Sequence, residues 1–153
     1  MAENSLADSS SEQETLVRRY FRDVLDEGKI EIVEELFHPQ CVMHRPGGIV
    51  TGIDAVRGVA ARRKETFAEF ATEILDIFGS ADRLVVRLLH RGVGCGVWRS
   101  RFGSYDIAGK NVAWNAIAIF RFAEGKIIEE WVTRDELGMI LQLELVKPSD
   151  NAS

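Results

Sequence analysis

An apolar run that stops at a Glu-Gly pair constrains the fold of this chain more than any other segment. The run covers residues 111–122, the pair is Glu124-Gly125, and a second strand-like run follows at 126–134. Two such runs separated by a two-residue turn predict a β-hairpin. An antiparallel sheet is therefore expected in the C-terminal part of the chain.

The predicted turn also fixes which side chains of the hairpin lie together. If Ala123 faces Lys126 and the pairing continues without interruption, side chains alternate between two faces. One of these two faces mixes aliphatic and charged side chains, which suits a surface covered by a partner subunit. A shift of one residue in the register would exchange these facing pairs. The other face mixes aromatic and small side chains with one carboxylate, as a cavity lining does: Trp114, Ala116, Ala118, Phe120, Trp131, Thr133 and Asp135.

Helices precede strands in the rest of the sequence. Ser11 and Glu14 form a capping box, which predicts that a first helix begins there and runs to Gly28. Helices followed by antiparallel strands indicate an α+β fold. Apolar spacing predicts two further helices over 30–37 and 54–67, and strands over 40–45, 70–78, 83–91 and 96–103.

The composition argues against several classes of protein. A formal net charge of −5 without a basic stripe argues against a nucleic-acid partner. No apolar segment approaches the roughly 20 residues that span a bilayer. The N-terminus lacks the basic and apolar regions of a secretory signal. Two cysteines, Cys41 and Cys95, do not make a disulfide framework, so we expect free thiols and a cytoplasmic location.

The chain length suits one domain with a single core. Residues 1–10 are small, polar and acidic, and we expect them to form a disordered tail. The single domain is expected over residues 11–146, and a second disordered tail over 147–153.

The segment GKIIEEWVTRDELGMILQL, residues 125–143, resembles the C-terminal hairpin of the SnoaL-like polyketide cyclase family, which belongs to the nuclear transport factor 2-like superfamily. The similarity extends upstream to VRRYFRDVLDEGKIEIVEELFHPQCVMH and TGIDAVRG. The resemblance implies a cone-shaped α+β barrel, in which three N-terminal helices pack on a curved, mostly antiparallel sheet that encloses a pocket. It also implies a homodimer and chemistry without a cofactor or metal.

The resemblance assigns roles to single residues. The catalytic aspartate of the polyketide cyclases falls on Asp135. Those cyclases carry a glutamine and a histidine at the positions held here by Ala116 and Ala118. Their polar residue on the first strand falls on Met43, and His44 beside it is a candidate second proton-transfer group. The acid is therefore retained, while its hydrogen-bonding partners are replaced.

Each candidate also has a structural interpretation. Asp135 could cap the helix expected over 136–143, a role that aspartate fills well. His44 could be a strand histidine that bonds a backbone carbonyl. His38, Cys41 and His44 have a spacing that suggests a metal site, but the proline at position 39 and the change from helix to strand argue against convergence of the three side chains, so no metal site is expected.

These observations predict a cofactor-independent enzyme for a hydrophobic, oxygenated small molecule of polyketide, terpenoid or steroid type. Asp135 would be the general acid/base of a cyclisation, isomerisation or dehydration, and His44 would assist it. Two alternatives stay open: a non-catalytic binding protein for a lipophilic small molecule, and a structural dimerisation domain. The predicted substrate-binding residues are Met43, Trp114, Ala116, Ala118, Phe120, Trp131 and Thr133.

Overall fold

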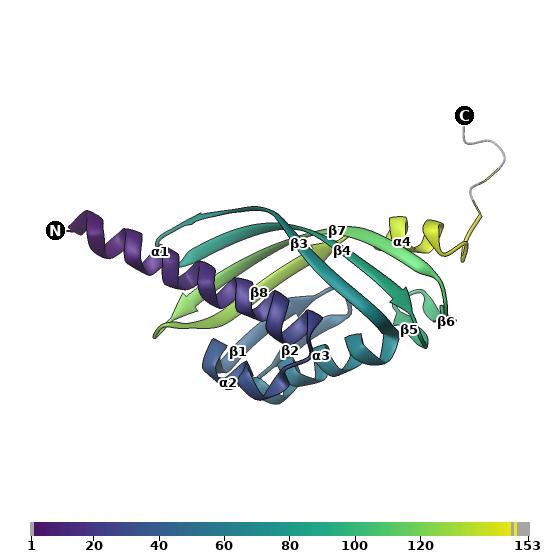
Figure 1. Cartoon of the computed structure of the whole chain (residues 1–153), viewed down its shortest axis with the longest axis horizontal. Coiled ribbons are helices and arrows are strands. Elements are labelled where there is room, and N and C mark those ends of the chain that lie inside the picture. Colours follow the sequence, from purple (N-terminus) through teal and green to yellow (C-terminus); the bar gives the residue numbers. More distant parts are fainter. Residues whose placement is uncertain (1, 148, 150–153) are drawn as a thin grey trace.

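The computed structural model describes residues 2–147 and 149, with side chains from residue 10 onward. A curved six-stranded sheet arches over the helices (Figure 1). The strand order is β2-β1-β8-β7-β4-β3, and β5 and β6 form a separate two-stranded sheet. All paired strands are antiparallel except β1 and β8. The strands are β1 Phe37–Arg45, β2 Gly48–Thr51, β3 Phe67–Ser80, β4 Arg83–Gly94, β5 Val97–Ser100, β6 Gly103–Asp106, β7 Asn111–Ala123 and β8 Lys126–Arg134.

The helices confirm the predicted α+β class and the cone-shaped arrangement. The first helix changes from α to π geometry at Tyr20 and then ends before Gly28. No helix among residues 2–147 is long and apolar enough to cross a membrane. The helical elements are α1 Ala2–Arg19, η1 Tyr20–Asp26, η2 Ile30–Ile32, α2 Val33–Leu36, α3 Ile53–Thr66 and α4 Glu136–Gln142.

Two elements differ from the sequence prediction. Helix α1 begins at Ala2 rather than at Ser11, so it includes most of the segment expected to be a disordered tail. Inside the helix, the Ser11 carbonyl accepts a hydrogen bond from the Thr15 hydroxyl at 3.0 Å instead of Ser11 acting as a cap. The strand predicted over 96–103 is two short strands, β5 and β6, with a turn at 101–102. The tail expected over 147–153 lies mostly outside the described residues.

The concave face of the sheet carries the core. Inward side chains of β4 and β7 alternate with outward ones, as half-buried strands require. Tyr20 is fully buried and packs edge-on against Phe37 and Phe120, with ring centroids 4.9 and 6.1 Å apart. Each large apolar side chain buried in this way contributes about 1.5–3 kcal/mol to folding. The narrow end of the cone is therefore filled by side chains.

A β-bulge interrupts the predicted hairpin. Ala123 pairs with Lys126 and Phe122 with Ile127, as the turn predicts, but Arg121 then pairs with Glu129. The residue skipped on β8 is position 128, so every later pair is shifted by one. The register predicted from uninterrupted alternation is therefore wrong beyond Ile127.

The bulge exchanges the two faces of β8. Glu130 pairs with Phe120 and is buried on the concave side, while Trp131 pairs with Ile119 on the convex side. Val132 packs against the core, and Thr133 is exposed. The interior thus receives a carboxyl where the uninterrupted pattern would have placed a tryptophan.

Thiol labelling would test this face assignment. In a Cys95→Ser background, which leaves only the buried Cys41, we expect Thr133→Cys to react quickly with a thiol reagent and Val132→Cys to react slowly, because only position 133 is exposed. The labelling rates would be followed by mass spectrometry under native conditions. Uninterrupted alternation makes the opposite forecast, so faster labelling at position 132 would contradict the bulge.

Candidate functional site

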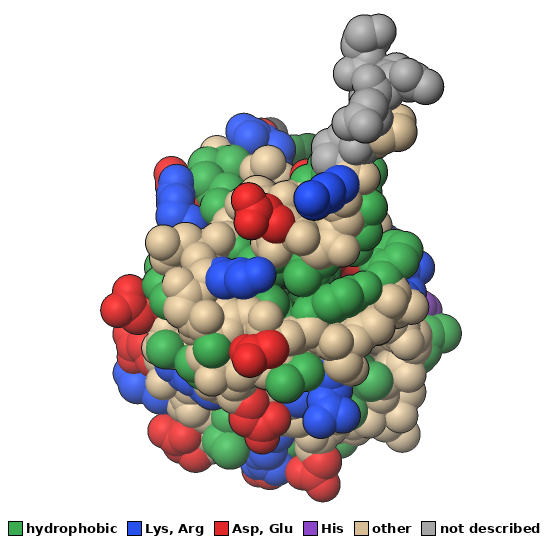
Figure 2. All heavy atoms as spheres, turned by 90° about the vertical axis from the view of Figure 1, so that its right-hand side faces the viewer, with side chains coloured by type: hydrophobic (Ala, Val, Ile, Leu, Met, Phe, Trp, Pro, Cys, Tyr) green, Lys and Arg blue, Asp and Glu red, His purple; other side chains and the backbone are tan. Residues whose placement is uncertain are grey.

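The wide end of the cone contains a pocket of about 320 Å³. It lies among the C-terminal half of α3, the turn between β1 and β2, β5, and the start of α4. Figure 2 views the molecule from the end that carries β5, β6 and α4, where hydrophobic side chains lie exposed among basic and acidic ones. The apolar walls are Val59, Phe67, Trp98, Trp114 and Met139, and the basic lining residues are Arg45, Arg62, Arg63, Arg99 and Arg134.

Two of these arginines have carboxylate partners. A guanidinium nitrogen of Arg45 lies 3.9 Å from Glu130, and one of Arg134 lies 3.2 Å from Glu136. Arg63 instead lies over the ring of Phe70, with its guanidinium carbon 4.3 Å from the centroid. Burial, followed by the nearby charge of Arg45, lowers the pKa of Arg63 to about 10. Burial likewise lowers the pKa of Arg134, so two guanidinium groups of the pocket lie in an environment that disfavours their charge.

A buried polar cluster lies behind this arginine wall. Glu130 is 2 % exposed, and burial raises the pKa of its carboxyl despite the opposing charges of Arg45 and Arg63. Burial also raises the pKa of the Tyr20 hydroxyl, with a further contribution from Glu130. Within the described residues, the Tyr20 hydroxyl, one oxygen of Glu130 and one terminal nitrogen of Arg63 have no hydrogen-bond partner. Buried polar atoms rarely lack a partner, so these three atoms call for one from outside the chain, such as water or a ligand.

A hydrogen-bonded chain runs along the next part of the interior. The Thr72 hydroxyl donates to Asp26 at 2.7 Å, so its oxygen accepts from Nδ1 of His90 at 3.0 Å. This order leaves Nε2 of His90 without a proton. Burial and the charges of Arg63, Arg134 and Arg45 lower the pKa of His90 to about 2. His90 is therefore a neutral imidazole, packed 5.3 Å from the ring of Trp114.

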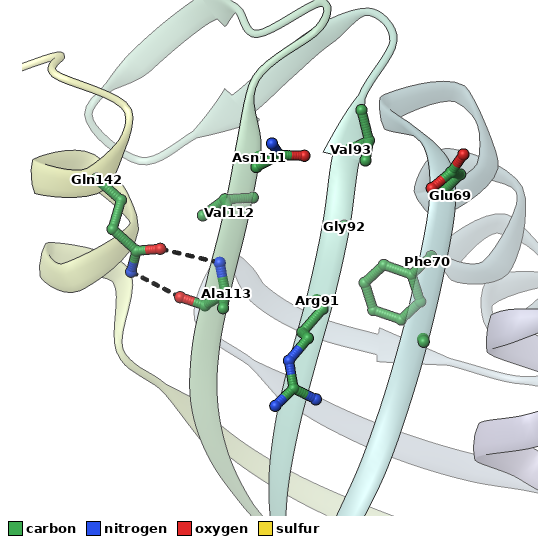
Figure 3. Close-up of a pocket in the computed structure, with 10 residues that line it drawn as sticks. Glu69, Phe70, Arg91, Gly92, Val93, Asn111, Val112, Ala113 and Gln142 are labelled. Atoms are coloured by element: carbon green, nitrogen blue, oxygen red, sulfur yellow. Dashed lines mark hydrogen bonds between the residues drawn. The ribbon is translucent and has the colours of Figure 1, made fainter.

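A second, larger hollow of about 500 Å³ lies on the convex face, across β3, β4 and β7. Figure 3 shows Gln142 of α4 reaching its edge, where the amide exchanges two hydrogen bonds with the backbone of Ala113. Arg91 pairs with Glu73 at 3.0 Å. The titratable side chains that line this convex hollow, Glu69 and Arg91, are exposed. The hollow therefore offers fewer constraints on a ligand than the interior pocket.

The model of the SnoaL-like polyketide cyclase family matches residues 15–143. The chain belongs to the SnoaL-like polyketide cyclase family. No curated protein matches the sequence significantly.

Solved structures share the fold of this SnoaL-like protein. TsrD from Streptomyces laurentii has a TM-score of 0.79 at 20% identity, over 89% of this chain and 97% of that one. AclR, a putative hydroxylase from Streptomyces galilaeus, has a TM-score of 0.75 at 17% identity, over 92% and 86%. IdmH, a putative polyketide cyclase from Streptomyces antibioticus, has a TM-score of 0.72 at 21% identity, over 86% and 98%.

Five of the predicted site residues lie in the interior of this SnoaL-like fold. Trp114 lines the pocket, and the others are buried on the concave face of β1 and β7. The two alanines on β7 belong to the buried core cluster and do not line the pocket. The five residues are Met43, Trp114, Ala116, Ala118 and Phe120.

Asp135 lies at the start of α4 and not in the pocket lining. It is the N-cap of α4, where its side chain accepts a hydrogen bond from the amide of Gly138 at 2.8 Å. The capping interpretation is therefore confirmed. Asp135 is exposed, and it shares no apolar face with Trp114 and Trp131 because the bulge has turned Trp131 outward.

His44, Trp131 and Thr133 were predicted to lie in the pocket, but they lie on the convex side of the sheet. The ring of His44 stacks on Trp131 with centroids 5.2 Å apart, and its Nε2 lies 2.9 Å from Glu129. The guanidinium carbon of Arg83 lies 5.4 Å from the Trp131 ring. The bulge in β8 explains the correction for Trp131 and Thr133, because it reverses the facing of that strand end. His44 lies on β1, where it alternates with the buried Met43.

The functional residues that the sequence prediction missed had weak signals. Arg63 belongs to a run with Arg62 and Lys64 that looks like a solvated helix face. Its helical spacing from the buried Val56 and Val59 could have placed it inward. Glu130 had no such signal, because only the bulge turns it inward.

The neutral state of His90 makes stability depend on pH. In the unfolded chain, the pKa of a histidine is near 6.5. The contribution of neutral, buried His90 to the free energy of unfolding is therefore fully present above the pKa of the unfolded state. It is lost as the pH falls toward the pKa of His90 in the folded state, which is about 2. Between pH 8 and pH 5 we expect a loss of about 2 kcal/mol from this residue alone.

Urea unfolding of wild type and His90→Asn at pH 8 and pH 5 would measure that loss. The asparagine amide can still donate to Thr72 but cannot take up a proton. The variant should be less stable at pH 8, because it leaves a cavity, yet should lose about 2 kcal/mol less than wild type on acidification. Equal losses in both proteins would contradict the neutral assignment.

Proposed function

We propose that this SnoaL-like protein is a cofactor-independent enzyme that transfers a proton on a hydrophobic, oxygenated small molecule, and that Glu130 is the proton-transfer group. The observation that carries the proposal is the burial of Glu130 at 3.9 Å from Arg45, which lines the aromatic pocket, while Glu130 itself lies behind the lining. An acid whose pKa is shifted by burial beside a cleft favours a functional role.

The proposed reaction is a cyclisation through an enolate. The Glu130 carboxylate takes a proton from a carbon next to a substrate carbonyl, and the electron pair moves onto the carbonyl oxygen. The enolate carbon then bonds to a second carbonyl carbon, and the new alkoxide takes the proton back from Glu130. A raised pKa makes Glu130 a stronger base for the first step and keeps it able to return the proton.

Tyr20 and the arginines suit the charge that develops in this reaction. The Tyr20 hydroxyl lies beside Glu130 and Arg45, which both act on its pKa, so a hydroxyl donor stands next to the proposed base. Arg45 lines the pocket and also approaches Glu130 at 3.9 Å, so it connects the substrate space with the acid. Donors fixed in a water-poor interior stabilise such charge more than they would in water.

Family membership supports cyclisation of a polyketide over the other predicted reactions and substrates, because the family model is that of polyketide cyclases. The resemblance would place the acid/base at Asp135. In this chain Asp135 is committed to the α4 cap and is exposed, which is why the proposal moves this role to Glu130.

Non-catalytic binding of a lipophilic molecule is a second candidate function. Ala116 and Ala118 favour it, because the middle of the concave face offers no polar side chain of β7 to an enolate. In a carrier, the buried polar cluster would serve binding alone.

Two variants separate these possibilities. After a thermal-shift and turnover screen of polyketide, terpenoid and steroid-like compounds, kcat would be measured for Glu130→Gln and Asp135→Asn. We expect Glu130→Gln to lower kcat by about 10²–10⁴-fold, because glutamine cannot transfer the proton. Asp135→Asn should retain most activity, since asparagine is an equally good N-cap.

The outcomes have distinct meanings. A larger loss in Asp135→Asn than in Glu130→Gln would overturn the role of Glu130 and return it to Asp135. Ligand-induced stabilisation without turnover in wild type would overturn the enzyme and favour the carrier. Circular dichroism and the melting temperature of each variant control for misfolding.

A further inference from the structure

The pocket has more positive charge than its surroundings neutralise. Five arginines line it, and the only acidic lining residue is Glu65. Among the residues that the structure describes, Arg62, Arg63 and Arg99 form no ion pair with a carboxylate, and of these three Arg63 is partly buried while Arg62 and Arg99 are exposed. Glu136, the partner of Arg134, is shared with Arg101 at 2.8 Å. An excess of guanidinium groups around a partly enclosed space indicates that a negative ligand completes the site.

Arg63 is the most informative of these residues. It extends from α3 on the same face as Val56 and Val59, and its guanidinium lies against Phe70. One terminal nitrogen is buried and has no partner in the described part of the chain. Leaving a charged donor buried and unpaired is costly, so an acceptor from outside the chain is expected at this nitrogen.

The neighbouring arginines increase that cost. Arg45 and Arg134 line the same pocket, and the charge of Arg45 lowers the pKa of both Arg63 and Arg134. Glu130 approaches Arg45 at 3.9 Å, so it can balance the charge of one of these guanidinium groups and not of all three. A bound anion would relieve the repulsion among three guanidinium groups at once.

The apolar walls define the rest of the ligand. Phe67, Trp98, Trp114 and Met139 line the pocket, and its volume of about 320 Å³ suits a small ring system. Planar guanidinium groups match the two oxygens of a carboxylate. We propose that the pocket binds an aromatic or polycyclic molecule through a carboxylate, with Arg63 as its anchor. This assignment rests on the proposed function, since it names the substrate class of the same site.

Three probes with one ring system test the proposal. Isothermal titration calorimetry would compare 2-naphthoate, its neutral methyl ester and 2-naphthyl phosphate. We expect the ester to bind at least about tenfold more weakly than the carboxylate, because it loses a charge-assisted hydrogen bond. Binding of 2-naphthoate should weaken in high salt. Tighter binding of the phosphate than of the carboxylate would overturn the choice of carboxylate.

Variants on one helix then locate the anchor. Arg63→Met should weaken 2-naphthoate binding by about 10- to 100-fold. It should also raise the melting temperature of the ligand-free protein, because an unpaired buried charge is removed. Arg63→Lys keeps the charge without the planar fork and should have intermediate affinity. The matched control is Arg57→Met, which removes a charge from the same helix at a residue that pairs with Glu34 and Asp54. It should leave 2-naphthoate affinity unchanged.

Two further results would overturn the proposal: equal affinity for the carboxylate and its ester, or a lower melting temperature in Arg63→Met with unchanged 2-naphthoate affinity. Neither decides the proposed function, which depends on turnover in wild type and Glu130→Gln. Carboxylate binding without turnover would keep the anion pocket and overturn the enzyme. Turnover of neutral substrates with no preference for anions would keep the enzyme and overturn the anion pocket.

Discussion

The extra residue at position 128 determines what chemistry the interior of this protein can contain. Without it, strand β8 would direct Trp131 and Thr133 inward. With it, the strand directs Glu130, Val132 and Arg134 inward, and the two outward residues join His44 on the convex side. One inserted residue therefore changes an aromatic wall into a wall with a buried acid and a guanidinium group.

The interior is divided along the length of the cone. At the narrow end, aromatic and aliphatic side chains around Tyr20 and Phe120 form a close-packed cluster. At the wide end, Trp98 and Trp114 belong to a second cluster with side chains of α4. The charged residues lie between these apolar clusters. Tight packing on both sides holds the buried charges apart from water, which is what makes them chemically useful and energetically costly.

The sequence predicted those features that depend on local chemistry. Period-two alternation gave the strands, the Glu-Gly pair gave the hairpin turn, and aspartate before a helix gave the cap at Asp135. The bulge was not predictable, because Ile128 and Glu129 are ordinary strand residues on either register. The hydrogen bonding of His90 was not predictable either, because its partner Thr72, and Asp26 beyond it, lie on two other elements. Sites built from long-range contacts and one register shift leave little trace in local spacing.

The parallel pairing of β1 with β8 joins segments from opposite ends of the chain. The sheet neighbours of β1 are β2 and β8, so β1 has only the short β2 beside it until residues 126–134 have left the ribosome. Contacts of such large sequence separation form late, because the intervening chain must first lose its freedom. The nascent chain therefore carries Cys41 and Met43 without their cover through most of its synthesis. Pairing of β1 with β8 therefore completes the sheet, and until it forms the apolar side chains of β1 lack one of their two neighbouring strands.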